Sequence, residues 1–141
     1  MPYEFEWEAQ GAFKRFSGFV TAEEFFASIQ RFQSHPAFFC ARYTINDFSA
    51  VEATDVAGKD VRRFAAFAAQ AHQLNPSLRV AIVTADAALR QLIDTHLDTE
   101  AAGVPLRIFA TLAEAREWTG NAAPDDPPAL CVEPTADLDR L

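Results

Sequence analysis

The stretch that decides the fold is Arg42 to Asp60, RYTINDFSAVEATDVAGKD. Its residue pattern predicts a β-strand from Arg42 to Phe48, a polar turn from Ser49 to Thr54, and a long helix that begins near Asp55. In α/β sheets, the carboxyl ends of strands converge with the free N–H groups of helix starts, and ligands or partner loops bind there. We therefore expect the functional surface at this tip.

The predicted strand has an unusual polar face. Tyr43 and Ile45 alternate with Arg42, Thr44 and Asn46, so the two sets point to opposite sides of the sheet. A buried polar group without a partner costs about 1–3 kcal/mol. We therefore expect the polar face to be open to solvent, to face a ligand, or to hydrogen-bond to a second subunit in a homodimer.

A hairpin and a helix are predicted before this stretch. The strict alternation from Tyr3 to Glu8 is typical of a half-buried strand, and Ala12 to Ser17 is expected to return as the second arm. Thr21 and Glu24 have the spacing of a capping box, in which the two side chains satisfy free backbone N–H groups at a helix start. A helix is therefore expected from about Ala22 to Ser34.

The chain after the stretch alternates helices and strands. The continuous apolar run from Leu78 to Thr84 indicates a strand that is covered on both faces. The other expected elements are a helix ended by Asn75-Pro76 with the inner stripe Val61, Phe64, Ala68, Ala71 and Leu74, a helix capped by Asp86, a strand from Pro105 to Phe109, and a short helix from Thr111 to Trp118. The order β-β-α-β-α-β-α-β-α predicts an α/β fold with a mixed β-sheet and an N-terminal hairpin.

Length and composition indicate one domain with a tail. The chain has 141 residues, half of them hydrophobic and 13 of them Phe, which suits a single domain with an aromatic-rich core. We expect this domain to span residues 1–119. From Gly120 onward prolines and acidic residues dominate, so residues 120–141 are expected to form a mobile, acidic, Pro-rich tail.

The net charge of −8, from 20 acidic and 12 basic residues, argues against nucleic acid and anionic membranes as partners, because both require clustered Lys and Arg. No apolar run approaches the roughly 18–20 residues that span a bilayer. The N-terminus lacks a basic start followed by an apolar stretch. We therefore expect a cytoplasmic protein that is not an integral membrane protein.

No arrangement of side chains indicates catalysis, a metal or a cofactor. The serines, the three histidines and the five glycines fit no nucleophile, metal-ligand or phosphate-binding motif. Cys40 and Cys131 lie in unlike contexts and are expected to be unpaired thiols. Asp47 and Asp55 flank the predicted turn and are conceivable as an acid–base pair. The simpler interpretation is that Asp47 fixes the turn and Asp55 caps the helix.

Four segments in order resemble bacterial SpoIIAA-like (STAS) domains: FSGFVTAEEF, INDFSAV, RVAIVTAD and RIFATLAEAREW. The resemblance covers about Phe5 to Trp118. It is greatest to a SpoIIAA-like branch whose architecture also resembles CRAL-TRIO lipid-transfer proteins. The resemblance implies the same single-domain α/β fold.

In the regulatory members of that family, which are anti-sigma factor antagonists, a D-x-S-G turn leads to D-S-S-G at a helix start, where a partner kinase phosphorylates a serine. The resemblance aligns Asp47 and Ser49 with the first motif, and Ala50 stands where its glycine would be. Asp55 and Gly58 match the two ends of the second motif.

The two serine positions of the second motif hold Val56 and Ala57, neither of which has a hydroxyl that can accept a phosphoryl group. The resemblance therefore implies a non-enzymatic regulatory module that binds a protein partner and lacks this phosphorylation switch. The residues expected to bind the partner are Asp47, Ser49, Asp55, Val56, Ala57 and Gly58. The alternative is a small protein that binds an apolar ligand or lipid, as the similarity to CRAL-TRIO domains implies.

Overall fold

The computed structural model describes residues 3–97 and 103–120 of the chain. Its elements follow the predicted order, with one additional 3₁₀ helix, η1, between the first helix and the third strand. They are β1 (Tyr3–Glu8), β2 (Gly11–Val20), α1 (Ala22–Ser34), η1 (Pro36–Cys40), β3 (Tyr43–Thr54), α2 (Gly58–Leu74), β4 (Arg79–Val83), α3 (Ala87–Leu97), β5 (Leu106–Phe109) and α4 (Leu112–Gly120).

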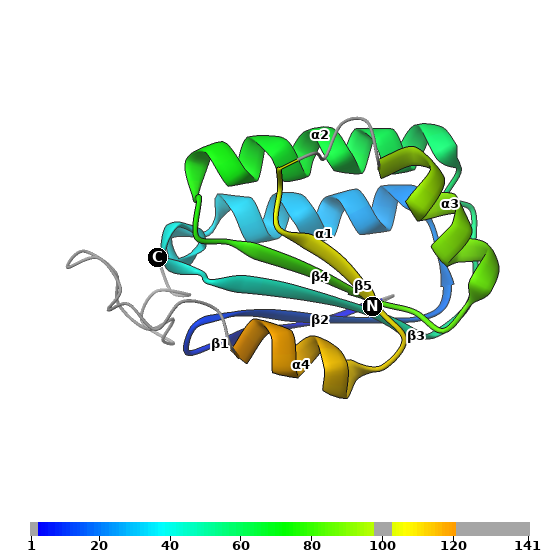
Figure 1. Cartoon of the computed structure of the whole chain (residues 1–141), viewed down its shortest axis with the longest axis horizontal. Coiled ribbons are helices and arrows are strands. Elements are labelled where there is room, and N and C mark those ends of the chain that lie inside the picture. Colours follow the sequence, from blue (N-terminus) through cyan, green and yellow to red (C-terminus); the bar gives the residue numbers. More distant parts are fainter. Residues whose placement is uncertain (1–2, 98–102, 121–141) are drawn as a thin grey trace.

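The five strands form one mixed sheet in the order β1-β2-β3-β4-β5. β1 is antiparallel to β2, and the other neighbouring pairs are parallel. Helices α1, α2 and α3 cover one face of this sheet, and of the helices in the described part of the chain α4 covers the other (Figure 1). The prediction of an α/β domain with a mixed sheet and an opening hairpin is confirmed.

The core has two parts because the sheet separates them. The larger part lies under α1, α2 and α3, where Phe16 stacks on Phe48 with ring centroids 4.7 Å apart. The smaller part lies under α4 and consists of Phe13, Ile45, Ala81, Val83 and Ala115, with Tyr43, Phe109, Leu112 and Trp118 packed against it. The aromatic-rich core expected from the composition therefore lies mainly on one side of the sheet.

The predicted helix caps are present. The backbone N–H of Glu24 donates to Thr21 Oγ1, and the backbone N–H of Thr21 donates to Glu24 Oε2, each at 3.1 Å. Asp86 Oδ1 accepts from the backbone N–H of Ala88 at 2.9 Å. These bonds satisfy N–H groups that have no partner inside the helix, and so they set where α1 and α3 begin.

The predicted turn from Ser49 to Thr54 is wrong, because β3 continues to Thr54. β2 also continues to Val20, through register shifts at which Gly18 takes a positive φ of 65°. Among the described residues, β1 pairs with β2 as far as Phe16, and β4 pairs with β3 as far as Asp47. Beyond these points, residues 17–20 of β2 and 50–54 of β3 form a two-stranded parallel ribbon, which we call the ribbon. Its polar residues resemble a turn in sequence because both of its faces are partly exposed.

The predicted helix start at Asp55 is also wrong. α2 begins at Gly58, and Ala57 is its N-cap residue. Asp60 Oδ2 accepts from the backbone N–H of Ala57 at 2.9 Å, whereas Asp55 accepts from the start of α1 instead. The sequence offers two carboxylates near one helix start, and local pattern alone does not decide which of them binds it.

Three further expectations concern the cysteines, Leu74 and the tail. Cys40 is disulfide-bonded, so the expectation of two unpaired thiols is wrong; sequence spacing carries no information about which cysteines meet in space. Cys131 and residues 121–141 of the predicted tail lie outside the described residues. Leu74 is 52% exposed, because the apolar stripe of α2 ends one turn earlier.

Among residues 3–97 and 103–120, no helix has the length and apolar character needed to cross a bilayer.

Candidate functional site

The starts of α1 and α2 are joined at one corner of the molecule. Asp55 Oδ1 accepts a hydrogen bond from the backbone N–H of Ala22 at 2.7 Å. Thr54 Oγ1 donates to the carbonyl of Val20 at 2.7 Å and accepts from the backbone N–H of Val56 at 3.2 Å. These bonds fix the linker between β3 and α2 to the end of β2. We call the ribbon together with residues 55–58 the tip.

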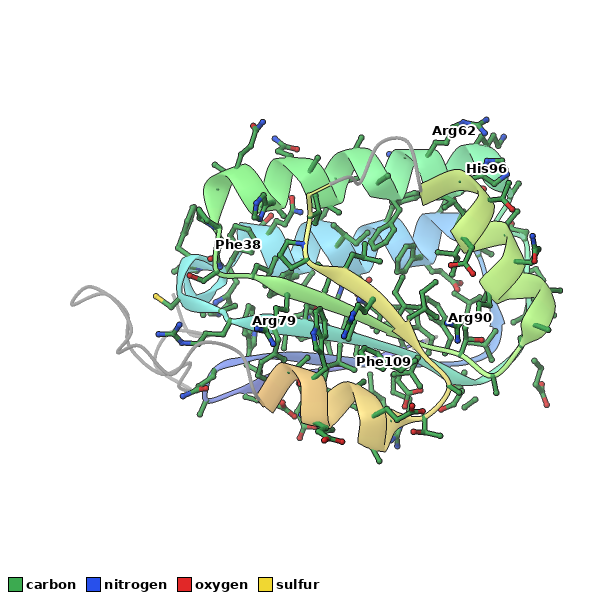
Figure 2. All side chains as sticks on the ribbon, viewed as in Figure 1. Phe38, Arg62, Arg79, Arg90, His96 and Phe109 are labelled. Atoms are coloured by element: carbon green, nitrogen blue, oxygen red, sulfur yellow. The ribbon has the colours of Figure 1, made fainter. Side chains whose placement is uncertain are left out.

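Helix α3 closes the tip from the side. A β-carbon on Gly58 would lie 2.5 Å from Nε2 of His96, so only glycine fits here without moving the ring. His96 Nδ1 lies 2.9 Å from Nη1 of Arg62, one turn further along α2. Figure 2 shows Arg62 and His96 together at the end of α2 that faces α3. The tip is therefore supported by three helices.

Four of the six predicted partner-binding residues meet at the tip. Asp55 and Ala57 are exposed there, and Val56 and Gly58 are half-buried. Ser49 is exposed at the base of the ribbon, where its hydroxyl donates to Asp47 Oδ1 at 2.5 Å.

Asp47 does not belong to the tip surface. Its side chain is buried, its Oδ1 accepts from the backbone N–H of Ser49 at 2.9 Å, and its Oδ2 lies 3.5 Å from Nε of Arg15. Asp47 therefore fixes the backbone after it, as expected, but within a strand. Eight residues of mostly extended chain place Asp47 on the order of 20 Å from Asp55. The two carboxylates do not form an acid–base pair.

An apolar cavity lies directly beneath the tip. Its volume is about 30 Å³, and Val56 lies at its wall. The other residues that line it come from α1, α2, α3, β3 and β4, and they are Phe25, Phe48, Thr54, Asp60, Val61, Phe64, Ile82, Leu89 and Ile93. The position of this cavity was not predicted from local sequence patterns, because its walls come from five separate elements.

Phe19 was not predicted as a functional residue. It lies in the ribbon and is 59% exposed. Two other large hydrophobic residues of the described ranges are more than half exposed, Phe39 and Leu74. They belong to η1 and to the end of α2, at the opposite end of the sheet (Figure 1).

A second unpredicted feature is a polar cluster inside the larger core. Lys14 is 1% exposed, its Nζ donates to Ser28 Oγ at 3.3 Å, and it lies 5.6 Å from the ring centroid of Phe32. Burial lowers the pKa of Lys14 to about 7. Thr44 Oγ1 and Asn46 Oδ1, beside it on β3, have no hydrogen-bond partner in the described part of the chain.

The burial of this cluster narrows the three expectations for the polar face of β3. Thr44 and Asn46 are buried, so the expectation of a solvent-open face is wrong. Contact with a second subunit also loses its motivation, because α1 and α2 cover this face. Of the three expectations, a ligand-facing strand stays open. Lys14 lies two residues from both Ala12 and Phe16, so it shares their face of the strand. This spacing was the signal that a charged residue points inward.

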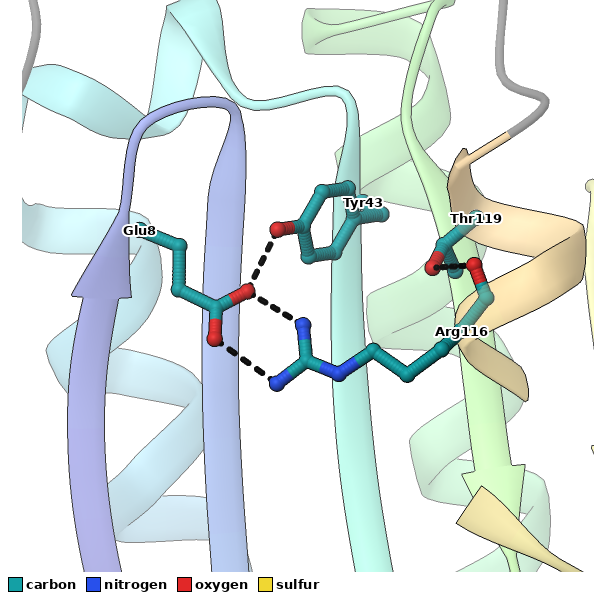
Figure 3. A network of polar contacts seen from close by, with 4 residues as sticks. All are labelled: Glu8, Tyr43, Arg116 and Thr119. Carbon is teal, nitrogen blue, oxygen red and sulfur yellow. Dashed lines mark hydrogen bonds and ion pairs between the residues drawn. The ribbon is translucent and has the colours of Figure 1, made fainter. Parts of the chain in front are cut away.

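On the α4 side, Glu8, Tyr43 and Arg116 form a closed network (Figure 3). Nη1 and Nη2 of Arg116 lie 2.5 Å and 2.7 Å from the two carboxylate oxygens of Glu8, and the hydroxyl of Tyr43 also donates to Glu8. The Arg116 hydrogen bonds hold the pKa of Glu8 below its usual value, while burial and the Glu8 contact raise the pKa of Tyr43 to about 12. The network fastens α4 to the sheet.

Comparison with solved structures places this architecture. The chain is similar to a solved structure of the anti-sigma factor antagonist SpoIIAA in its unphosphorylated form. The TM-score is 0.58, and the match covers 84% of this chain and 97% of that chain. The chain has the SpoIIAA fold. The sequences are 12% identical, so the likeness shows the fold alone. No protein-family model matches the chain, and no curated protein matches it in sequence.

Proposed function

We propose that this SpoIIAA-fold chain is a cytoplasmic, non-catalytic regulatory module that binds a protein partner through its tip. The observation that carries the proposal is the 59% exposure of Phe19 beside the joined starts of α1 and α2. Exposed aromatic side chains on a rigid surface are the usual anchors of protein interfaces. The SpoIIAA fold supports the proposal, because SpoIIAA is an anti-sigma factor antagonist.

The tip suits a partner because its backbone is already ordered. The bonds from Thr54 and Asp55 to the end of β2 and the start of α1 hold it in place, so binding costs little additional chain entropy. With respect to the strands that the structure describes, both outer edges of the ribbon lie beyond the pairing of β1 and β4, and they offer backbone groups to an incoming segment.

The proposed function does not include regulation by a phosphoserine at the start of α2. Val56 and Ala57 stand at the two positions concerned, Val56 lines the cavity, and Ala57 is exposed at the start of α2. We infer that the partner binds this surface in its unmodified form, without phosphorylation by a kinase at this helix start.

The proposal is tested by comparing two phenylalanines of nearly equal exposure. Phe19→Ala removes the proposed anchor, and Phe39→Ala, at the opposite end of the sheet, is the matched control. Both variants and the wild type are cross-linked in lysate of the source cell, and the captured proteins are identified by mass spectrometry. We expect one partner to be lost with Phe19→Ala and kept with Phe39→Ala. Equal capture by all three proteins would place the interface elsewhere.

A second candidate function is binding of a small apolar ligand, and the cavity beneath the tip favours it. The cavity walls are almost wholly apolar, and Leu89 and Ile93 of α3 close one side of it. Native mass spectrometry of the purified protein is the direct test, because a bound ligand adds a fixed mass. A spectrum that contains the bare chain alone, before and after incubation with alkyl ligands, would remove this candidate.

A further inference from the structure

We propose that the C-terminal segment of this chain covers the exposed side chains of Phe39 and Leu74, and that a disulfide between Cys40 and Cys131 fastens it there. The covered surface is formed by η1 and the end of α2, and we call it the η1 corner. Reduction of the disulfide releases the segment, so the cover responds to redox conditions. The η1 corner lies at the end of the sheet opposite the tip (Figure 1), and the inference does not depend on the proposed function.

The disulfide identifies which segment reaches the η1 corner. Cys40 is the last residue of η1, it is half-buried, and it is disulfide-bonded. The chain has two cysteines, and the other one is Cys131, so within one chain Cys131 is the partner of Cys40. A disulfide holds its two Cα atoms within about 7 Å of each other. The residues beside Cys131 are thereby held against the η1 corner.

Two large apolar side chains are exposed at this corner. Phe39 is 56% exposed and Leu74 is 52% exposed. Asn75 brings them together, because its Nδ2 donates to the carbonyls of Phe38 and Ala41 at 2.9 Å and 2.7 Å and so joins the end of α2 to η1. Exposed apolar side chains that gather at one place mark contact surfaces, whereas single ones do not.

The segment around Cys131 has the composition to cover the η1 corner. Residues 129–132 read Ala-Leu-Cys-Val, an apolar run in a tail that is otherwise rich in Pro and acidic residues. In an extended Pro-rich chain with three residues per turn, successive side chains diverge by about 120°. Leu130 and Val132 therefore point to the two sides of the disulfide, where Phe39 and Leu74 are exposed. Removing these side chains from water favours the covered state.

The connection from α4 is long enough to reach Cys40. The carbonyl of Trp118 accepts from Nη1 of Arg79 at 2.8 Å, and the backbone N–H of Arg79 donates to the carbonyl of Arg42 at 2.9 Å. The end of α4 therefore lies at the same edge of the sheet as η1, which ends two residues before Arg42. Residues 121–130 extend over about 33 Å at most, which is enough chain to pass around this edge.

The fastening is reversible by thiol–disulfide exchange. Cys40 and Cys131 together give up two electrons and two protons to a low-molecular-weight disulfide, which is cleaved to two thiols as the bond between the cysteines forms. The reverse exchange with two small thiols restores both cysteines and frees the segment. Disulfides of cytosolic proteins, when present, are usually transient or redox-sensing, so a reversible fastener agrees with the cytoplasmic setting proposed above.

The disulfide is tested by peptide mapping of the wild type after incubation with oxidised glutathione. Free thiols are blocked with iodoacetamide, and the protein is digested without reductant for mass spectrometry. We expect a linked pair of peptides that contain Cys40 and Cys131, and we expect dithiothreitol to convert it into two separate peptides. Two alkylated cysteines after oxidation, stable mixed disulfides with glutathione, or a dimer linked between copies would each overturn the proposal.

The cover is tested by hydroxyl-radical footprinting, which reports the exposure of individual side chains. Phe19 is the reference within the same molecule, because it is 59% exposed at the other end of the sheet. In the oxidised wild type, Phe39 should be labelled at least about threefold less than Phe19. In Cys131→Ser the two labelling rates should agree within about twofold. Wild type that has been reduced and alkylated gives the same comparison without a substitution.

A further variant separates the apolar contacts from the covalent bond. The double substitution Leu130→Ser and Val132→Ser keeps both cysteines, so the linked peptides should still form, whereas Phe39 should be labelled nearly as fast as in Cys131→Ser. Equal labelling of Phe39 in the oxidised wild type and in Cys131→Ser would overturn the cover. The outcome of these experiments is independent of the Phe19 variants that test partner binding at the tip.

Discussion

Gly58 and His96 pack so closely that a β-carbon on Gly58 would lie 2.5 Å from the imidazole of His96. This contact joins the first residue of α2 to the last turn of α3, and it holds the two helices together beneath the tip. The glycine is required there by its neighbour and not by its own backbone, since the positive φ values of the described glycines occur at Gly18 and Gly103.

Gly58→Ala should therefore have opposite effects in two backgrounds. In the wild type the new methyl group displaces the His96 ring and breaks its contact with Arg62, and we expect a loss of about 1 kcal/mol in the free energy of unfolding. In a His96→Ala background the same change should be neutral or stabilising by up to about 1 kcal/mol, because alanine is the better helix former. Urea unfolding of the four proteins gives the coupling energy. A coupling near zero would contradict the contact.

Ala57 gives a prediction that separates stability from partner binding. Because Ala57 is the N-cap residue of α2 and has no capping side chain, Ala57→Ser should stabilise the protein by about 0.5–1.5 kcal/mol. Ala57→Asp should also stabilise it, but by less, since Asp60 already places a carboxylate at this helix start.

The two Ala57 variants differ in charge at the proposed interface. Ala57→Asp should lose the captured partner, because an unpaired carboxylate is costly to desolvate in an interface, and Ala57→Ser should keep it. Thermal melts and cross-linking capture of both variants check the two effects together. A partner that survives Ala57→Asp would move the interface away from the start of α2.

Lys14 predicts a particular dependence of stability on pH. Burial lowers its pKa from 10.5 to about 7, so the unfolded chain holds this proton up to a higher pH than the folded chain does. Stability must therefore rise as the pH increases from about 7 towards 10.5. Between pH 7 and pH 9 the wild type should gain about 2 kcal/mol relative to Lys14→Met.

The Lys14 prediction is measured as the difference in free energy of unfolding between the two proteins at each pH, so that groups common to both cancel. Lys59→Met controls for the loss of one exposed positive charge. Parallel pH profiles for wild type and Lys14→Met would show that the amine reaches water in the folded state.

The Glu8–Arg116 pair predicts acid sensitivity of the α4 layer. Arg116 holds the pKa of Glu8 below its ordinary value of 4.5, so the pair contributes stability above pH 4.5 that is lost as the pH falls through the lowered pKa. Because both side chains are partly exposed, the contribution is about 1 kcal/mol. Glu8→Gln should remove it at neutral pH.

The acid sensitivity is followed through Trp118 of α4, whose ring centroid lies 5.6 Å from that of Phe109, in a Trp7→Phe background with Trp118 as the reporting fluorophore. Its emission should change at a higher pH in Glu8→Gln than in the parent. Glu6→Gln, an exposed position on the same face of β1, should have no effect. An identical response in all three proteins would show that the pair does not hold α4.

Local signals in the sequence were sufficient for most of the fold. The capping box of Thr21 and Glu24, the Asp86 cap, and the apolar run in β4 each depend on residues within one turn or one strand, and all three are present in the structure. The limits of β3 depend on pairing with β2, which is separated from it by α1 and η1. Pairing over that distance leaves no local signal, so the ribbon was mistaken for a turn.

The candidate site was predicted less completely than the fold. Asp55 to Gly58 were placed together correctly because they are consecutive. Asp47 was added by motif alone, and extended backbone separates it from them. The surroundings of Lys14 and the walls of the apolar cavity come from elements that meet only after folding. The alternating polar residues of β3 were the one sign in the sequence of a long-range feature. They did not reveal what the polar face of the strand contacts.

The uneven division of the core has a consequence for the order in which the molecule opens. Within the described residues, the side under α4 has five buried apolar residues, and the half-exposed Glu8–Arg116 ion pair and the Trp118 contacts hold the helix there. Segments with few buried contacts undergo local unfolding at a free energy below that of the whole domain. The amide protons of α4 should thus exchange with solvent well before those of α1 and α2, and the molecule behaves as two cooperative units that share a single sheet.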